Sequence, residues 1–373
     1  MTFSIAKFLT VAVLGSALAA CGGDDPGTSA PAPVEAVAPS EKAQVDPSTA
    51  FLEMAARHAS AYLAEYPEGA TQLGVSPEIA GADYASRLAG YGFDASEKAR
   101  ELNEQFAQEL RSFSRDDLTG TAQATYDVLN NAYNLASRRN AFPFGGATPA
   151  GGAVPQVGAI WAVSPYLVTQ LTGPHLYIPR MLQTQHAVAS KSDVEAYLSR
   201  LEDFGRAFDE IIETINSDAA AGVTPPYFSI EGVIGSAQAL RAPAPSEHPL
   251  VTALTGKMAL LNDVDEEAQA AYAAQAIAHV ENVVYPAYGR LEATMENLLP
   301  QAGTDAGVWR LGPEGEAFYQ MALDAYGAGG MSGDEVHELG LSEVARITAE
   351  MDAILKGEGL TEGAVSERLA ILN

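Results

Sequence analysis

The chain has 373 residues, of which 47% are hydrophobic, and its 48 Asp and Glu residues outnumber its 21 Lys and Arg residues. The formal net charge of −27 repels phosphate backbones, so the composition excludes nucleic acid as an expected partner. The chain contains a single cysteine, Cys21, so it cannot form an internal disulfide and must be stabilised by packing.

The beginning of the chain has the pattern of a bacterial lipoprotein signal. Residues 8–20 form a short hydrophobic stretch after Lys7, and they end in Leu-Ala-Ala before Cys21, which resembles a lipobox. About 20 apolar residues are needed to span a bilayer, so this stretch is too short for a permanent membrane helix. We expect residues 1–20 to be removed as a signal peptide and Cys21 to carry a membrane-anchoring lipid. The alternative, a buried structural cysteine, fits poorly with the polar, glycine-rich residues that follow.

The residue after the cysteine indicates the destination of the exported protein. Gly22 occupies the position at which aspartate marks inner-membrane retention in well-known Gram-negative bacteria. The sequence therefore favours a lipoprotein of the outer membrane that faces the periplasm, with the lipid on Cys21 as its contact with the membrane.

The composition changes twice along the mature chain. Residues 21–48 are rich in Pro, Ala, Ser and acidic residues and contain no aromatic residue, so they cannot bury enough apolar surface to order themselves and are predicted to be a disordered tether. In residues 49–373 apolar residues recur at spacings of three and four, while alternation with period two is nearly absent. We therefore predict one mainly α-helical domain over residues 49–373.

Two predicted helices have clear start signals. One runs from Ser192 to about residue 215 with Glu195 in its first turn, and the other begins at Ser332 with Glu335 in its first turn. In each case the serine and the glutamate three residues later match a capping box, in which the two side chains bond to free backbone amides of the first turn. Apolar residues follow on one side of both predicted helices.

The other predicted elements are less sharply bounded. A helix over residues 266–299 contains Pro286, which removes one backbone hydrogen bond and is expected to kink or split it. Residues 141–158 are expected to form a long loop of the length that is often functional, and at residues 227–234 a short strand stays an alternative. Further helices are expected at residues 51–66, 95–113, 121–140, 176–188, 247–261, 313–327 and 361–372.

The motifs of common enzyme classes are incomplete. His337 and Glu338 begin an HExxH zinc motif, but residue 341 is leucine, and zinc binding requires two histidines four residues apart on one helix face. Residues 144–158 are glycine-rich without matching a phosphate-binding loop, and Ser236 does not lie in a GxSxG turn. We predict no catalytic residue and no metal ligand in this chain.

Six stretches, taken in order, resemble one bacterial family, domain of unknown function 885, whose members are commonly exported and often lipoproteins. The longest stretch, near the end of the chain, is the strongest match. The matching stretches are residues 62–74, 173–179, 193–201, 221–226, 285–291 and 312–351.

The resemblance implies a large helical array similar to the helical walls of HExxH zinc peptidases, with a cleft between the walls. In such relatives a later helix carries HExxPGH and binds zinc, which is therefore expected only in full-length relatives and not in this chain. The chain ends at Asn373 before any counterpart of that motif, so we expect the amino-terminal portion of the family domain without the carboxy-terminal catalytic half.

Four residues are candidates for lining such a cleft and for contacting a peptide ligand: Tyr166, His175, Tyr177 and Arg180. His175 stands out because it lies beside tyrosines and between two prolines. The alternative for His175 is a hydrogen-bonded structural histidine before a helix.

The resulting hypothesis is the non-catalytic part of an exported, zinc-metallopeptidase-like lipoprotein. The alternative is a lipid-anchored helical module that binds peptides or assembles with other proteins without enzymatic activity. In both cases helices that lack a packing partner should expose apolar faces, through which the chain would bind a complementary chain or self-associate. The residues expected in this exposed patch are Val344, Ile347, Met351, Ile354, Leu369 and Ile371.

Overall fold

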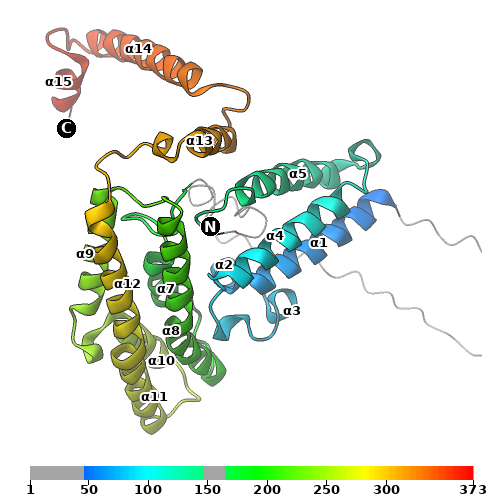
Figure 1. Cartoon of the computed structure of the whole chain (residues 1–373), viewed down its shortest axis with the longest axis vertical. Helices are drawn as coiled ribbons and strands as arrows, with labels where there is room; N and C mark the ends of the chain where they lie inside the picture. Colours follow the sequence, from blue (N-terminus) through cyan, green and yellow to red (C-terminus); the bar gives the residue numbers. More distant parts are fainter. Residues whose placement is uncertain (1–45, 147–163, 373) are drawn as a thin grey trace, which may run out of the picture. The chain divides into compact units, whose positions relative to one another are not determined.

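The computed structural model describes residues 46–146 and 164–372, and every regular element among them is a helix (Figure 1). The mainly α-helical class predicted from the spacing of apolar residues is confirmed. The predicted signal peptide, Cys21 and most of the predicted tether and of the loop at 141–158 lie outside the described residues. No helix in the described part of the chain is both long and apolar enough to cross a membrane.

The α-helices follow one another along the chain, and among the described residues turns, 3-10 segments and one π-helical turn lie between them. They are α1 (Pro47–Glu65), α2 (Pro67–Leu73), α3 (Pro77–Ala80), α4 (Phe93–Leu110), α5 (Gly120–Asn140), α7 (Pro174–Thr184), α8 (Lys191–Ala220), α9 (Tyr227–Arg241), α10 (Pro249–Met258), α11 (Glu266–His279), α12 (Tyr285–Leu298), α13 (Pro313–Ala325), α14 (Gly333–Gly357) and α15 (Val365–Ala370). The predicted helices at 51–66, 95–113, 121–140, 176–188, 247–261, 313–327 and 361–372 all have a counterpart, with ends within four residues of the prediction.

Two of the local predictions are confirmed. The capping box of α14 is present, because Ser332 accepts a hydrogen bond from the Glu335 amide and the Glu335 carboxylate accepts one from the Ser332 amide. The helix predicted at 266–299 is interrupted between α11 and α12 by the π-helical turn Val280–Val284, and Pro286 lies in the first turn of α12, where a missing N–H is tolerated.

Two local predictions are wrong, and one alternative that the sequence left open does not form. Helix α8 is capped by Ser190, which accepts from the Asp193 amide, so the predicted box of Ser192 and Glu195 lies two residues too late. The segment 227–234 is not a strand but the beginning of α9, whose buried residues recur at helical spacing. Helix α1 begins at Pro47, inside the predicted tether, because Asp46 caps its first turn.

The main hydrophobic core surrounds α8. Phe204 and Phe208 of α8 are fully buried, their ring centroids lie 5.6 Å apart, and the Phe208 ring lies 4.6 Å from that of Tyr288 on α12. Side chains from α7, α9, α10, α11 and α12 complete this core. A second cluster joins α1, α4 and α5. Because α8 contributes residues at spacings of three and four along most of its 30 residues, it is the central helix of the larger core.

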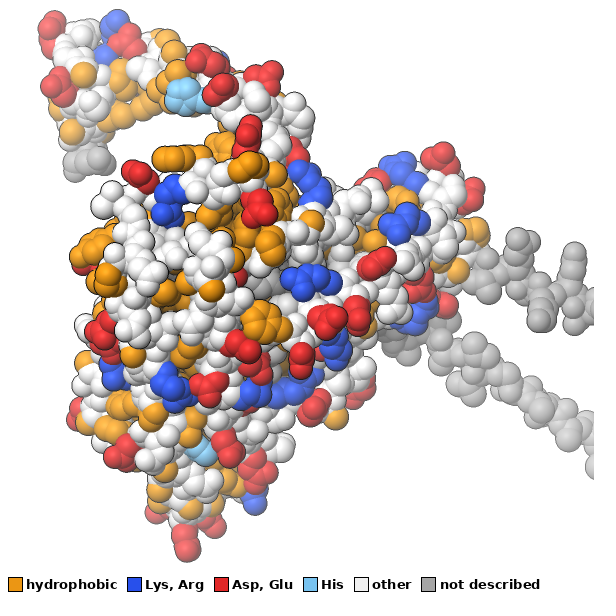
Figure 2. Space-filling model, in the orientation of Figure 1, with side chains coloured by type: hydrophobic (Ala, Val, Ile, Leu, Met, Phe, Trp, Pro, Cys, Tyr) orange, Lys and Arg blue, Asp and Glu red, His pale blue; other side chains and the backbone are white. Residues whose placement is uncertain are grey.

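Helix α14 differs from α8 in its packing. Of its 25 residues only Leu355 is buried, and hydrophobic side chains appear on its surface in Figure 2. Val344, Ile347 and Ile354 are 64%, 45% and 66% exposed, and Ile371 after α15 is 68% exposed. Met351 and Leu369 are partly exposed. The exposed apolar patch predicted at these positions is confirmed.

Candidate functional site

A buried carboxyl group lies where α2 meets α7 and the segment before α4. Glu68, in the first turn of α2, is fully buried, and its Oε1 atom accepts hydrogen bonds from the Ala89 amide at 3.0 Å and from the Tyr91 hydroxyl at 2.9 Å. The Tyr91 hydroxyl is 2.7 Å from the hydroxyl of Tyr177 on α7. Burial raises the pKa of Glu68, and these hydrogen bonds, together with the charge of Arg200, oppose that shift.

Next to this carboxyl group, α8 contributes a fully buried guanidinium group, that of Arg200. Its Nε atom donates to the Arg87 carbonyl at 3.0 Å, and Nη2 donates to the Thr71 hydroxyl at 2.7 Å and to the Tyr84 carbonyl at 2.9 Å. The Nη1 atom is 2.9 Å from Nδ1 of His186. Burial lowers the pKa of Arg200 only to about 10, so the group stays charged at neutral pH. Arg200 therefore ties α2, the 84–87 segment and the end of α7 to α8.

The state of His186 follows from its neighbours. Burial and the charge of Arg200 lower the pKa of His186 to about 4, so the ring is neutral at pH 7. Because Nδ1 faces the guanidinium of Arg200, it acts as the acceptor, and Nε2 is then the donor to the Asp193 carbonyl at 3.2 Å. The histidine is thus a neutral link between Arg200 and the first turn of α8.

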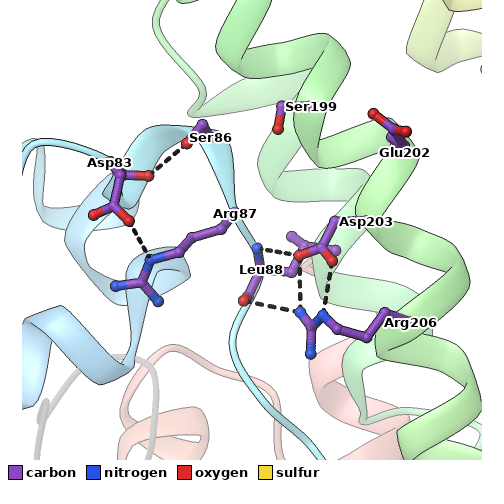
Figure 3. A pocket seen from close by; sticks show the side chains of 8 residues that line it. All are labelled: Asp83, Ser86, Arg87, Leu88, Ser199, Glu202, Asp203 and Arg206. Carbon is purple, nitrogen blue, oxygen red and sulfur yellow. Dashed lines mark hydrogen bonds and ion pairs between the residues drawn. The ribbon is translucent and has the colours of Figure 1, made fainter.

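The same junction has an accessible outer side. A surface pocket of about 460 Å³ lies beside α8 (Figure 3), and Arg206 and Asp203 form a two-bond ion pair in its wall, at 2.7 and 2.8 Å. The Asp203 carboxylate also accepts a hydrogen bond from the Leu88 amide at 2.8 Å, and this bond holds the 84–92 segment against α8. The pocket is lined by Asp83, Ser86, Arg87, Leu88, Ser199, Glu202, Asp203 and Arg206.

The polar groups of the pocket suit binding better than covalent chemistry. The Ser86 hydroxyl donates to the Asp83 carbonyl at 2.8 Å, so it is not paired with a base that would activate it as a nucleophile. Ser199 and Glu202 are exposed, and their side chains have no hydrogen-bond partner among the described residues. They are available to a polar ligand, while Arg206 and Asp203 are occupied by each other.

The four predicted cleft-lining residues have different environments, and none of them lines the pocket of Figure 3. The Tyr166 hydroxyl accepts a hydrogen bond from Nη2 of Arg310 at 2.9 Å. Tyr177 belongs to the Glu68 network, Arg180 is exposed on α7, and His175 is buried in the first turn of α7. A shared role of these residues in a cleft stays a prediction.

His175 has an unusual environment. Its side chain is 1% exposed, and neither ring nitrogen has a hydrogen-bond partner among the described residues. Its backbone carbonyl accepts a hydrogen bond from the Tyr288 hydroxyl. The alternative of a hydrogen-bonded structural histidine therefore does not hold for the ring, whose burial without a partner costs about 1–3 kcal/mol. Burial also lowers the pKa of His175 to about 4.

The described residues do not fit the zinc site that the family resemblance implies for longer relatives. His337 is exposed on α14 with Leu341 one turn later, and His58 is paired with Tyr133 at 2.9 Å and Glu109 at 3.0 Å. Within residues 46–146 and 164–372 no three His, Cys, Asp or Glu side chains converge as metal ligands would.

Sequence reasoning missed Glu68 and Arg200. A signal was present for Arg200, because it lies between Tyr197 and Phe204 at helical spacing and thus interrupts the apolar stripe of α8 with a charge. A charged residue on a buried stripe needs partners within the core. Glu68 lies inside the first stretch that resembles the family, but its partners come from residues 89 and 91, which no local pattern connects to it.

Replacing Arg200 is expected to destabilise the fold strongly. In Arg200→Met the carbonyls of Tyr84 and Arg87 and the Thr71 hydroxyl lose their donor, and Glu68 loses the nearby positive charge. We expect the free energy of unfolding in urea to fall by about 3–5 kcal/mol. Arg111→Met, at an exposed arginine that ends α4, is the control and should change it by less than about 0.5 kcal/mol. Equal effects of the two substitutions would contradict the role of Arg200.

His175 should make the stability depend on pH. Its folded-state pKa is lowered from 6.5 to about 4, so protonation favours the unfolded chain. The contribution of neutral His175 is complete above pH 6.5 and is lost as the pH falls toward 4. Between pH ~7.5 and ~5 the loss amounts to about 2 kcal/mol.

The measurement is urea unfolding at both pH values. His175→Leu should remove this part of the pH dependence, whereas His337→Gln, at an exposed histidine of α14, should keep it. If the free energy of unfolding of His175→Leu depended on pH as strongly as that of the wild type, the ring would not be buried in its neutral form.

Comparison with known proteins gives the family. The family described as a bacterial protein of unknown function, DUF885, matches residues 67–373. A protein from Colwellia psychrerythraea with a solved crystal structure, described as a "putative lipoprotein", is 25% identical with a TM-score of 0.76. The match covers 88% of this chain and 54% of that one, so this chain spans about half the length of the solved structure. No curated protein matches significantly. Since the family match extends over most of the sequence, the chain belongs to the bacterial family DUF885.

Proposed function

We propose that this chain is the amino-terminal helical part of an exported, membrane-anchored lipoprotein of the zinc-peptidase-like kind, and that it supplies a helical wall rather than catalytic groups. The observation that carries the proposal is the fold match to the Colwellia protein, which covers 88% of this chain but only 54% of the longer Colwellia chain. The incomplete HExxH motif at His337 and the separate environments of the described histidines agree with a non-catalytic role.

The anchoring part of the proposal rests on the first 22 residues. The residues around Cys21 resemble a lipobox, and Gly22 favours the outer membrane on its periplasmic side. The description of the Colwellia protein as a lipoprotein supports this part. A lipid on Cys21 would hold a strongly acidic protein at a membrane whose anionic headgroups repel it.

A second candidate function, a lipid-anchored module that binds peptides, is favoured by the pocket of Figure 3. The side chains of Glu202 and Ser199 have no partner within the described part of the chain, and the pocket also contains the partly exposed Arg87. An extended peptide offers both amide groups and charged side chains to such a surface. In this case the chain would bind its ligand without cleaving it.

Metal content and hydrolysis test the first proposal. We expect the purified mature chain to hold no stoichiometric zinc by elemental analysis and to leave a mixed fluorogenic peptide library uncleaved. One zinc per chain, with hydrolysis that chelation removes and zinc restores, would refute it. Saturable peptide binding by calorimetry, weakened in Glu202→Gln, would favour the binding module instead.

Lipidation is tested by metabolic labelling in a Gram-negative host. Radioactive palmitate should enter the full chain, and Cys21→Ser should abolish the label because the thiol is the acceptor. Ser16→Ala, within the predicted signal peptide, is the matched control and should label normally. Labelling that persists in Cys21→Ser would remove the anchoring part of the proposal.

A further inference from the structure

The pocket of Figure 3 carries one more negative charge than positive charges. Its lining contains three carboxylates, those of Asp83, Glu202 and Asp203, and two guanidinium groups, those of Arg87 and Arg206. The pocket volume of about 460 Å³ lies within the range of small-ligand sites, which is roughly 300–1,000 Å³. The pairing of these five side chains therefore decides which kind of chemical group the pocket can take.

The guanidinium group of Arg206 already has protein acceptors. It pairs with Asp203 and with Glu210, at 2.7 and 2.8 Å. Its Nη2 atom also donates to the backbone carbonyls of Leu88 and Ala89, each at 3.1 Å. These bonds join α8 to the opposite wall of the pocket, so the two walls are connected before any ligand binds.

The guanidinium group of Arg87 has acceptors on the other side of the pocket. Its Nη2 atom donates to the Ala64 carbonyl of α1, and its Nε atom lies 3.4 Å from the Asp83 carboxylate. A carboxylate or phosphate ligand would have to displace these acceptors or those of Arg206, because anions bind to guanidinium groups through the same N–H donors. The pocket is therefore unsuited to an anionic ligand.

Glu202 is the lining carboxylate that has no cationic partner in the described part of the chain. Ser199 and Glu202 lie three residues apart on α8, which makes them neighbours on one face of the helix. Both side chains are exposed. The carboxylate offers two acceptor oxygens and the hydroxyl offers a third. Such acceptors match a positively charged group with several N–H donors.

An organic cation fits these groups better than a metal ion does. Magnesium and calcium require several oxygen ligands around one point, and the described ranges contain no group of three His, Cys, Asp or Glu side chains that could hold a metal ion. An ammonium or guanidinium group needs only one opposite charge and hydrogen-bond acceptors. The formal net charge of −27 also attracts cations to this protein.

We propose that this pocket binds the cationic side chain of a lysine or arginine in a peptide, with Glu202 as its charge partner and Ser199 as a further acceptor. The inference rests on the second candidate function, the peptide-binding module, and names the class of peptide that the module takes. A volume of about 460 Å³ exceeds that of one ammonium group, so the pocket has room for peptide atoms beside the cation.

The test is an NMR titration of the purified chain with three blocked tripeptides, acetyl-Ala-Lys-Ala-amide and its counterparts with Met or Glu in the centre. Blocking the ends leaves the central side chain as the only difference in charge. We expect the Lys peptide to shift the amide signals of residues 83–88 and 199–206 saturably, and added salt to weaken its binding. The Met and Glu peptides should bind about threefold or more weakly.

A free amine separates the two sources of the cation. n-Butylammonium carries the same charge as the Lys side chain without a peptide, and it should bind about threefold or more weakly than the Lys peptide, because it makes fewer contacts in the pocket. Equal affinities would assign the pocket to free amines and overturn the inference for peptides.

Three variants of α8 test the assignment to Glu202. Glu202→Gln should weaken binding of the Lys peptide about threefold or more, and Glu202→Asp should retain most of the affinity because the charge is kept. Glu213→Gln is the matched control, since Glu213 is an exposed glutamate of the same helix outside the pocket lining, and it should leave the affinity unchanged. All three changes lie at exposed sites, so the variants should melt like the parent chain. An unchanged affinity in Glu202→Gln would overturn the inference.

Failure of the inference is distinguishable from failure of the proposed function. If the Met peptide binds as tightly as the Lys peptide and both bind less well to Glu202→Gln, peptide binding stands and the preference for a cation is refuted. If none of the three peptides shifts the amides of the pocket, the binding module and the inference are both refuted. Zinc content and hydrolysis test the first proposal separately in either case.

Discussion

The buried guanidinium of Arg200 is the interaction on which the arrangement of the first helices around α8 depends. Taking a charge out of water is favourable only when its donors are satisfied, and here the acceptors are backbone carbonyls at Tyr84 and Arg87, the Thr71 hydroxyl and a neutral His186. These acceptors come from segments more than 10 residues apart in the chain. Their positions are therefore fixed together, by one side chain of α8.

The same network connects the interior to the accessible surface. The Arg87 carbonyl accepts a hydrogen bond from Arg200. The Arg87 side chain lines the pocket, and its Nε atom lies 3.4 Å from the Asp83 carboxylate. The buried Glu68 carboxyl and the Tyr91 hydroxyl hold the following residues from the other side. The pocket wall therefore shares Arg87 with the buried hydrogen-bond network.

Helices α8 and α14 show that similar amphipathic patterns can end in opposite environments. Both have apolar residues at spacings of three and four, and both begin with a serine cap. The stripe of α8 is enclosed by five helices, whereas the stripe of α14 is exposed among the described residues. The hydrophobic pattern of a helix predicts that a face needs cover, but only neighbouring elements determine what covers it.

The sequence by itself determined the helical class, the capping box at Ser332 and the interruption near Pro286, because each of these signals acts within a few turns of one helix. It placed the cap of α8 at Ser192 rather than Ser190 and left a strand open at 227–234, since neighbouring polar residues compete as caps and short apolar runs are ambiguous. Only the tertiary structure decided that Arg200 and Glu68 are buried and that the His175 ring has no hydrogen-bond partner among residues 46–146 and 164–372. Burial and polar pairing depend on groups that lie far apart in the chain, and no local pattern encodes which of them will meet.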